Sequence, residues 1–430
     1  MIENEIAPIA DSLWTATANP APLCPPLSGS SETEVAVIGG GFTGLSAALH
    51  LALAGVRVTV LEAESPGWGA SGRNGGQVNP GLKEDPDTIE ARCGPDMGGR
   101  IVRLVGGAPD LVFSLIKRHE IDCDAVRTGW IQPIHDQVAL NVVKNRVDQW
   151  VRRGAPLRML TGPETSELLG TAAYIGGMLD SRGGNLHPLN YALGLAHAAQ
   201  RSGAVLHGGS RATRMLREGD HHVIETSQGR LTAARVLLCT NGYTDGLVAP
   251  MARTIVPIRS VQVATAPLSD NVSRSILPGG HAASDSRRLL LYFRLDRDGR
   301  FMMGGRGAYD TPGTLRQMEQ LRRASVELYP QLGDATWSHA WGGNVAMTAD
   351  HYPHLSRAGP GIMAALGYNG RGVAMATAMG KVLADWASGT PDIALDFPVT
   401  DARPIPLHIL RKPAVTATVA WYRLRDRMGI

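Results

Sequence analysis

Concentrated charge, cysteine and aromatic residues are all scarce in this chain of 430 residues. Phe, Trp and Tyr together make up 5% of it, and the net charge is only +3, with the basic residues spread along the chain. Proteins that bind nucleic acids usually present a concentrated basic face. The sequence therefore predicts no nucleic-acid partner.

The chain has 4 cysteines, at positions 24, 93, 123 and 239. None belongs to a CxxC pair or neighbours a histidine, which excludes a zinc knuckle and a redox dithiol, so no metal site is expected. So few cysteines in so long a chain fit a reducing compartment. The N-terminal residues also lack the positive start and apolar run of a secretion signal. These features predict a cytoplasmic protein.

Residues 35–56 carry no formal charge and are long enough to suggest a membrane span. Glycines at 39–41 and 44, together with His50, interrupt the stretch, and its pattern changes partway along. Glycine is abundant in the whole chain, at 51 residues, which suggests tight turns and close approach of backbone to a ligand. We therefore expect a strand, a turn and a helix here.

A glycine-rich motif follows the first predicted strand. Residues 34–38 (EVAVI) indicate a parallel strand buried on both faces, and residues 39–44 (GGGFTG) match G-x-G-x-x-G. A helix over 45–54, a strand over 56–61 and an acid that can bind ribose hydroxyls complete a dinucleotide-binding unit. The helix N-terminus favours a pyrophosphate. The predicted contacts are Gly39, Gly41, Phe42, Thr43, Gly44, Glu62 and Ala63.

Two later segments favour a flavin over a nicotinamide cofactor. The loop over 67–77 (GWGASGRNGGQ) is rich in glycine and in hydrogen-bond donors that suit an extended cofactor. A strand over 360–366 leads through a glycine turn into a helix over 374–387, whose N-terminus stabilises charge on a reduced flavin. A buried strand over 234–242 ends in another turn. The predicted contacts are Gly69, Ala70, Ser71, Arg73, Asn74, Gly75, Gly76, Gln77, Gly242, Gly370, Arg371, Gly372 and Val373.

These segments, with 183–190 (GGNLHPLN), 289–305 (LLLYFRLDRDGRFMMGG) and 421–430 (WYRLRDRMGI), resemble the D-amino-acid-oxidase-like family of FAD-dependent oxidoreductases. Within that family the chain is most similar to enzymes that act on gamma-glutamylputrescine in polyamine catabolism. The resemblance implies FAD, hydride transfer from a carbon bearing nitrogen to flavin N5, and hydrolysis of the imine to an aldehyde. Relatives with covalent FAD use a late cysteine or an early histidine that this chain lacks, which predicts non-covalent FAD.

The expected fold is α/β (α+β), with a Rossmann-like FAD-binding domain of glutathione-reductase type and an antiparallel-sheet substrate domain. Residues 296–299 (DRDG) predict a hairpin in that sheet, and residues 102–118 and 139–152 are candidate helices. The predicted divisions are an extended surface arm over 1–33, the discontinuous FAD-binding domain over 34–85, 170–248 and 348–392, the substrate domain over 86–169 and 249–347, and a basic and apolar tail over 393–430.

The candidates for substrate contact are Tyr292, Arg294, Trp341, Asn344, His351 and Tyr368. Relatives that oxidise amino acids often carry an arginine after the tryptophan–glycine pattern, where it clamps the carboxylate. Here Asn344 follows that pattern. This departure disfavours an α-amino or imino acid and favours an amine whose recognition group lies farther away. Arg294 and Arg371 are the candidates to bind a distant carboxylate.

Alternatives stay open at this stage. The main one is an imino-acid or secondary-amine dehydrogenase, pipecolate- or sarcosine-like, that passes electrons to a membrane acceptor. A flavin-binding structural or tRNA-modifying protein is the other. Both O₂ and a quinone-type carrier are candidate electron acceptors. The tail is interpreted either as a helix docked on its own domain or as an amphipathic helix in peripheral contact with a membrane.

Overall fold

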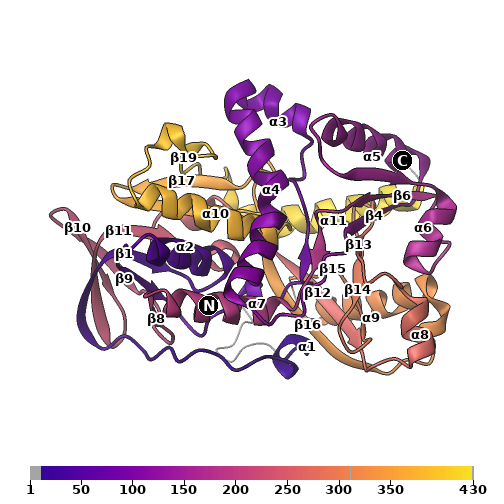
Figure 1. Ribbon diagram of the computed structural model, residues 1–430, viewed down its shortest axis with the longest axis horizontal. Helices are drawn as coiled ribbons and strands as arrows, with labels where there is room; N and C mark the ends of the chain where they lie inside the picture. The colour runs from indigo at the N-terminus through magenta and orange to yellow at the C-terminus, as the bar shows by residue number, and fades with distance from the viewer. Residues whose placement is uncertain (1–10, 310, 429–430) are drawn as a thin grey trace.

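A computed structural model of the protein describes residues 11–309 and 311–428. Two large sheets lie side by side in it (Figure 1). The first has the strand order β19-β17-β18-β11-β1-β2-β8, with the β9–β10 hairpin paired to β11. Its strands are β1 (Gly29–Ile38), β2 (Val58–Leu61), β8 (Val205–His207), β9 (Arg214–Glu218), β10 (His221–Glu225), β11 (Gly229–Leu238), β17 (His354–Gly359), β18 (Ile362–Leu366) and β19 (Val399–Asp401).

The second sheet has the order β16-β12-β15-β14-β13-β4-β6-β5. All its pairs are antiparallel, as predicted, except the parallel pair of β4 and β13. Its strands are β4 (Trp130–Ile134), β5 (Leu157–Leu160), β6 (Gly176–Asp180), β12 (Val256–Thr265), β13 (Ala282–Ser284), β14 (Tyr292–Leu295), β15 (Phe301–Arg306) and β16 (Trp337–Met347). A short ribbon joins β3 (Gln77–Val78) to β7 (Gly184–Asn185).

Helices cover the first sheet, and α4 stands near its boundary with the second in the view of Figure 1. The helix α10 packs against both α2 and α4, and α7 packs against α2. The α-helices are α1 (Leu13–Ala16), α2 (Phe42–Leu53), α3 (Pro86–Cys93), α4 (Pro95–His119), α5 (Gln137–Val151), α6 (Gly162–Leu169), α7 (Pro188–Arg201), α8 (Asp270–Ser275), α9 (Thr311–Leu328), α10 (Gly372–Ala387) and α11 (Arg411–Met428).

The strand β1 shows why the apolar run of its sequence is continuous. Val35 and Val37 belong to the core under the helices, whereas Ala36 and Ile38 belong to the core on the opposite face. A parallel strand buried on both faces needs apolar side chains at every position. The chain then enters α2 directly through the glycine turn, so the predicted strand, turn and helix are confirmed. No helix in the described part of the chain is both long and apolar enough to cross a bilayer.

The N-terminal segment differs from the predicted surface arm. Residues 1–10 lie outside the described residues, but α1 begins at residue 13 behind a capping box formed by Ser12 and Thr15. Leu13 and Trp14 are buried, and the Trp14 indole N–H donates to Asn74 O at 2.9 Å. The prediction of an extended arm is therefore wrong for this turn of helix. Large apolar side chains, rather than the nearby prolines, decide its position.

Three elements also cross the predicted divisions. β6 pairs with β4 and β5 in the second sheet, although the sequence grouped it with the first. The apolar face of α4 joins the core under α2 and α10, and β19 extends the first sheet beside β17. Pairing between distant strands sets these memberships, and no local pattern records it.

Protonation of His187 should destabilise the fold. The ring is buried, its Nδ1 accepts the N–H of Asn190 at 3.1 Å, and its Nε2 lies 3.0 Å from Thr17 Oγ1. Burial, followed by the charge of Arg294, lowers the pKa of His187 to about 3. The folded protein therefore favours the neutral form of His187. Its contribution to stability is complete above the pKa of histidine in the unfolded chain, near 6.5. That stability is lost as the pH falls from 6.5 toward 3.

We expect the His187 contribution to fall by about 2 kcal/mol between pH 6.5 and pH 5. Urea unfolding at the two pH values measures it, with His187→Asn as the comparison. Asparagine keeps an acceptor for the helix N-terminus but does not titrate in this range. The variant should lose about 2 kcal/mol less than the wild type over this interval. Equal losses in the two proteins would contradict the assignment.

Candidate active site

A cavity of about 1670 Å³ has walls from both sheets and from the helix and loop ends between them. Typical small-molecule sites have volumes of roughly 300–1,000 Å³, so this one has room for a large cofactor together with a substrate. In the part of the chain that the structure describes, no three His, Cys, Asp or Glu side chains gather as metal ligands would.

The predicted cofactor-binding residues gather on this cavity. Those that line it are Gly39, Gly41, Phe42, Thr43, Glu62, Ala63, Gly69, Ala70, Ser71, Arg73, Asn74, Gly75, Gln77, Gly370, Arg371, Gly372 and Val373. They come from four segments that are distant in sequence: the β1–α2 turn, the end of β2, the loop that follows β2, and the β18–α10 turn. The structure thus forms one continuous wall from the two glycine-rich regions.

The β1–α2 turn is shaped by the absence of side chains. Gly39 has φ +109°, and a Cβ there would lie 2.9 Å from Cys239 O. A Cβ on Gly41 would lie 2.8 Å from Ser71 Oγ. The backbone of this turn therefore stays exposed to the cavity, directly before the first N–H groups of α2. This cradle fits a pyrophosphate.

Glu62 stands at the end of β2, where the sequence predicted a ribose contact. Its Oε2 accepts the N–H of Gly40 at 2.6 Å, and its Oε1 accepts the N–H of Glu64 at 3.0 Å. Burial raises the pKa of Glu62, and these two backbone donors oppose the effect. A carboxylate fixed in this way has lone pairs left for ribose hydroxyls. Its position fits the adenosine half of FAD.

The loop that follows β2 is held rigid by its own hydrogen bonds. Ser71 Oγ accepts the N–H of Phe42 at 2.9 Å, and Asn74 Oδ1 accepts the N–H of Gly76 at 2.8 Å. Arg73 Nε donates to Trp68 O at 2.8 Å, and its guanidinium lies over the Trp68 ring at 4.5 Å. The loop therefore presents a fixed surface to a ligand.

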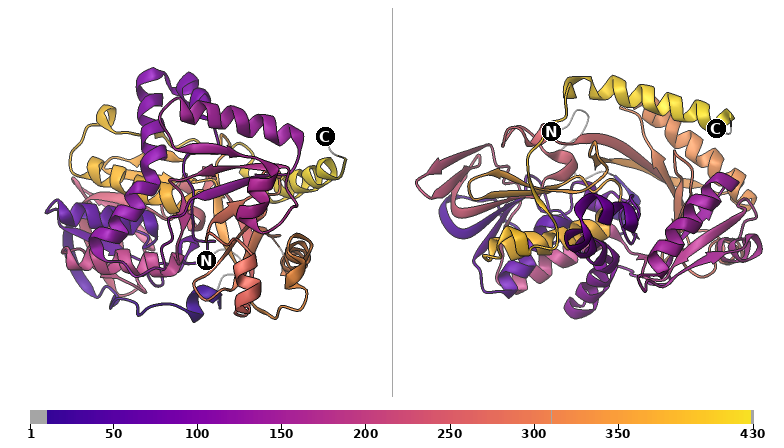
Figure 2. Two further views of the ribbon diagram at one scale, coloured as in Figure 1. Left: turned by 45° about the vertical axis from the view of Figure 1, so that its right-hand side comes forward. Right: turned by 90° about the horizontal axis from the view of Figure 1, so that it is seen from above.

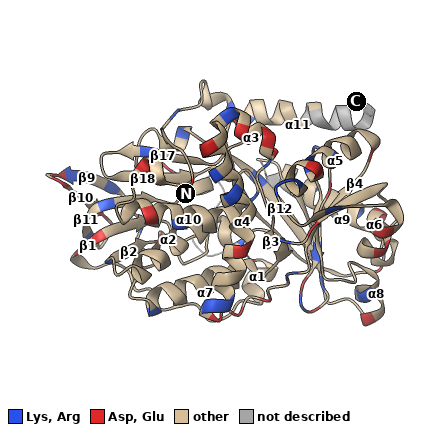
Figure 3. Cartoon of the chain, turned by 45° about the horizontal axis from the view of Figure 1, so that its top comes forward, with Lys and Arg blue, Asp and Glu red and all other residues tan. Residues whose placement is uncertain are grey.

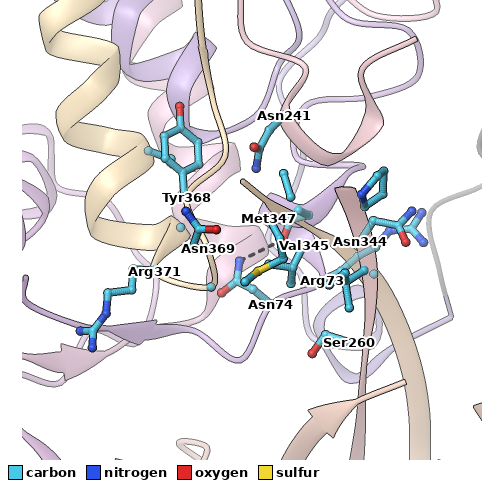
Figure 4. A pocket seen from close by; sticks show the side chains of 18 of the residues that line it. Arg73, Asn74, Asn241, Ser260, Asn344, Val345, Met347, Tyr368, Asn369 and Arg371 are labelled. Atoms are coloured by element: carbon cyan, nitrogen blue, oxygen red, sulfur yellow. Dashed lines mark hydrogen bonds between the residues drawn. The ribbon is translucent and has the colours of Figure 1, made fainter. Parts of the chain in front are cut away.

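Asn344 has the most informative position among the substrate candidates. It lines the cavity, it is 5% exposed, and its Nδ2 has no hydrogen-bond partner among the described residues. Figure 4 shows it on β16 near Val345 and Met347. A buried amide without a partner costs free energy unless a ligand satisfies it. The Nδ2 atom itself is closed off from the cavity, so Asn344 lines the cavity through other atoms, and its contact with a substrate stays a prediction.

Tyr292 and Tyr368 also line the cavity, but protein groups bind their hydroxyls. The Tyr292 hydroxyl lies 2.9 Å from Ser260 Oγ, and burial raises its pKa to about 12. The Tyr368 hydroxyl lies 2.7 Å from Thr43 Oγ1 and donates to Ala365 O at 2.9 Å. Tyr368 therefore offers its ring, rather than its hydroxyl, to a ligand.

Arg294 does not line this cavity, so a direct contact with substrate is not supported. Its Nε donates to Gly75 O at 2.8 Å, and its Nη2 donates to Leu186 O at 2.7 Å. Its Nη1 donates to Asn185 Oδ1 at 2.9 Å. The guanidinium is buried, and these contacts tie the loop that follows β2 to the second sheet. Its Nε, Nη1 and Nη2 atoms thus donate to acceptors within the protein.

Trp341 and His351 also lie off the cavity wall. The Trp341 indole N–H donates to Arg73 O at 3.0 Å, and its ring packs 5.8 Å from that of Trp14. His351 lies in the turn after β16 with φ +61°.

Three predicted cofactor contacts, Gly44, Gly76 and Gly242, likewise lie behind the wall, where a Cβ would meet backbone oxygens of Gly39, Leu186 and Asn344. These glycines permit close packing of backbone rather than contact with a ligand.

Several residues on the wall were not predicted. Gln262 lines the cavity, and its Nε2 donates to Arg73 O at 2.6 Å. Ser260 lies two residues earlier on β12, so period-two alternation would have found both on one face. Lys83 and Arg306 also line the cavity. No local pattern marks these two cations, because they lie in a loop and at a strand end.

Comparisons with known proteins agree with this geometry. Residues 34–386 match the family described as FAD dependent oxidoreductase, DAO. The chain is 35% identical to the probable oxidoreductase OrdL of Rhizobium meliloti (strain 1021) over 422 residues, which is 97% of each chain. It is 32% identical to the gamma-glutamylputrescine oxidoreductase of Escherichia coli (strain K12) over 426 residues, which is 97% of this chain and 99% of that protein.

Solved structures show the same fold. The crystal structure of glycine oxidase from Geobacillus kaustophilus superposes with a TM-score of 0.71 over 86% of this chain and 98% of that one, at 22% identity. The predicted Rossmann-like FAD-binding fold and the FAD cofactor are confirmed by these matches. The chain belongs to the DAO family of FAD-dependent oxidoreductases.

Proposed function

We propose that this protein oxidises a C–N bond in a small amine, gamma-glutamylputrescine or a close analogue. The observation that carries the proposal is the neutral residue Asn344 on the cavity wall, at the position where the family resemblance leads us to expect an arginine in relatives that oxidise amino acids. The 32% identity to a gamma-glutamylputrescine oxidoreductase supports the same substrate class. FAD, when bound, accepts a hydride from the carbon that bears nitrogen, and water then hydrolyses the imine to an aldehyde and ammonia.

The residues of the cavity bind and orient the amine rather than take its proton. Asn344 carries no charge, and Tyr292, whose pKa is raised to about 12, stays protonated at neutral pH. Hydride transfer from a neutral amine needs no strong base. The described acidic residues that line the cavity, Glu62, Asp136, Asp245 and Asp285, all bind other protein groups. This donor set suits an uncharged amine.

Anaerobic mixing of the yellow holoenzyme with single amines tests the proposal. We expect gamma-glutamylputrescine to bleach the visible flavin absorption, and putrescine, pipecolate and sarcosine to leave it unchanged on the same time scale. Bleaching by pipecolate or sarcosine alone would replace the proposal with an imino-acid or secondary-amine dehydrogenase. If no amine bleaches the flavin, the proposed substrate is withdrawn, while membership of the FAD-dependent oxidoreductase family stands.

Oxidation of the amine leaves two electrons that an acceptor must take up. O₂ or a quinone-type carrier is the proposed acceptor, and a cytoplasmic location stays a prediction. The helix α11 lies along the outside of the molecule (Figure 2). The segment before it exposes Leu407 and Ile409, which are 74% and 82% accessible. Peripheral membrane contact through residues 393–430 is compatible with this exposure and stays a prediction.

A further inference from the structure

Trp14 lies where α7 meets the second sheet. Figure 3 shows α1, which carries it, beside α7 and between the two halves of the molecule. Its ring centre lies 5.8 Å from that of Trp341, and the guanidinium carbon of Arg294 lies 5.1 Å from it. All three side chains are buried, and none of them lines the cavity. Trp14, Trp341 and Arg294 thus form one donor cluster behind the cavity wall.

The donor cluster binds three successive carbonyl groups of the loop that follows β2. Its hydrogen bonds run from Trp341 Nε1 to Arg73 O at 3.0 Å, from Trp14 Nε1 to Asn74 O at 2.9 Å and from Arg294 Nε to Gly75 O at 2.8 Å. These peptide bonds are trans, and in a trans peptide the N–H points opposite to the C=O of the preceding residue. The N–H groups of residues 74–76 are therefore directed away from the donor cluster, to the side where the loop lines the cavity.

Two of these three N–H groups are left for a ligand. The N–H of Gly76 donates to Asn74 Oδ1 at 2.8 Å. Within the described residues, the N–H groups of Asn74 and Gly75 have no acceptor. Backbone N–H groups are strong donors that rarely stay unpaired, and successive N–H groups on one side of a turn bind negative charge. The loop therefore presents a pair of fixed donors to the cavity.

The position of this pair favours the ring system of FAD over its phosphates. Ser71 accepts the N–H of Phe42 beside the cradle that fits the pyrophosphate. Farther along the loop, a Cβ on Gly75 would lie 2.9 Å from Tyr292 Cε2 in the second sheet. FAD with a ribose at Glu62 and its pyrophosphate at the β1–α2 turn would continue along this loop toward its ring. The pair thus lies at the flavin end of the cavity.

We infer that Trp14 and Trp341 are positioning residues that hold the N–H groups of Gly75 and Asn74 toward the flavin ring. Reduction of the flavin adds negative charge to its ring, and N–H dipoles fixed in advance stabilise such charge. Trp14 and Trp341 therefore raise the reduction potential of the bound flavin, although they contact neither it nor the substrate. The inference depends on the FAD cofactor and not on which amine is oxidised.

The reduction potential of the flavin, measured on holoenzyme by equilibration with a reference dye, tests the inference. Trp14→Phe keeps an aromatic ring but removes the N–H that binds Asn74 O. We expect the equilibrium constant for flavin reduction to fall about tenfold, which for two electrons is about 30 mV. Trp341→Phe should have a smaller effect, because Gln262 Nε2 also donates to Arg73 O, at 2.6 Å.

Trp386→Phe is the matched control. Trp386 is half-buried on α10, off the cavity wall, and its indole N–H has no acceptor in the described part of the chain. This variant should keep the wild-type potential. A purely structural role of Trp14 would lower thermal stability and FAD content without changing the potential of the FAD that stays bound, and that result would overturn the inference.

A second comparison decides the question if Trp14→Phe does not fold. A lowered potential in Trp341→Phe, with Trp386→Phe unchanged, would then support the positioning role. A wild-type potential in Trp341→Phe, or an equal shift in Trp386→Phe, would overturn it. None of these outcomes bears on amine oxidation, because the potential is measured without substrate.

Discussion

Gly44→Ala should yield a protein that retains less than about a tenth of the wild-type FAD. Gly44 lies in the first turn of α2, where a Cβ would stand 2.0 Å from Gly39 O and 3.0 Å from Val37 Cγ1. The nearer atom is backbone, so α2 has to move away from β1. Overpacking of this kind costs about 1–3 kcal/mol or more. The movement would displace the N–H groups that face the pyrophosphate.

FAD content per chain, from the ratio of visible to ultraviolet absorbance, measures the effect. Gly107→Ala is the matched control, because Gly107 is also helical and a Cβ there would meet nothing outside its own helix within 4 Å. That variant should keep its FAD and gain up to about 1 kcal/mol of stability.

Two further measurements separate loss of cofactor from loss of fold. Circular dichroism reports whether Gly44→Ala still folds. Gly41→Ala is a milder change, because its Cβ would meet only the Ser71 side chain, at 2.8 Å, and we expect a smaller loss of FAD. Full FAD occupancy in Gly44→Ala would show that the β1–α2 turn does not hold the cofactor.

Acid precipitation of the wild-type protein should leave the flavin in the supernatant, since non-covalent attachment is predicted.

Asn344→Arg should lower kcat/KM for the amine at least about 100-fold while FAD stays bound. The residue is 5% exposed and pairs across strands β12 and β16 with Arg259. Arg73 lies close by, since a Cβ on Gly343 would meet it at 3.0 Å. A new cation here adds like charge beside Arg259 at a buried position, and relieving that repulsion should displace this part of the cavity wall.

Asn344→Leu completes this experiment. It removes the polar amide without adding charge, and we expect a smaller loss, of about tenfold in kcat/KM. Asn145→Arg makes the same change on the exposed side of α5, off the cavity wall, and should leave turnover unaltered. Steady-state rates, each divided by the FAD content of the variant, decide the outcome. Wild-type turnover by Asn344→Arg would remove Asn344 from the substrate site and, with it, the main support for an amine substrate.

For Arg294, the strand pattern predicts the correct face of the sheet but the wrong role, which was contact with the substrate. Tyr292 and Arg294 lie two residues apart on β14, so alternation places both on one face. The structure agrees, but the loop that follows β2 covers the Arg294 end of that face and accepts from its guanidinium through Gly75 O at 2.8 Å. Tyr292 stays on the cavity wall. Whether a side chain on the right face reaches a ligand depends on what covers it, and the sequence of the strand does not contain that information.

Local interactions let the sequence by itself determine the β1–α2–β2 unit, its Glu62 and the flavin-type loop. Each depends on residues close together in the chain, such as the both-face burial of Val35–Ile38 and the positive φ of Gly39. The membership of β6 and the burial of Trp14 were decided only by the tertiary structure. So was the position of Lys83 and Arg306 on the cavity wall. These features come from packing between segments far apart in sequence, and such packing leaves no periodic signal in the chain.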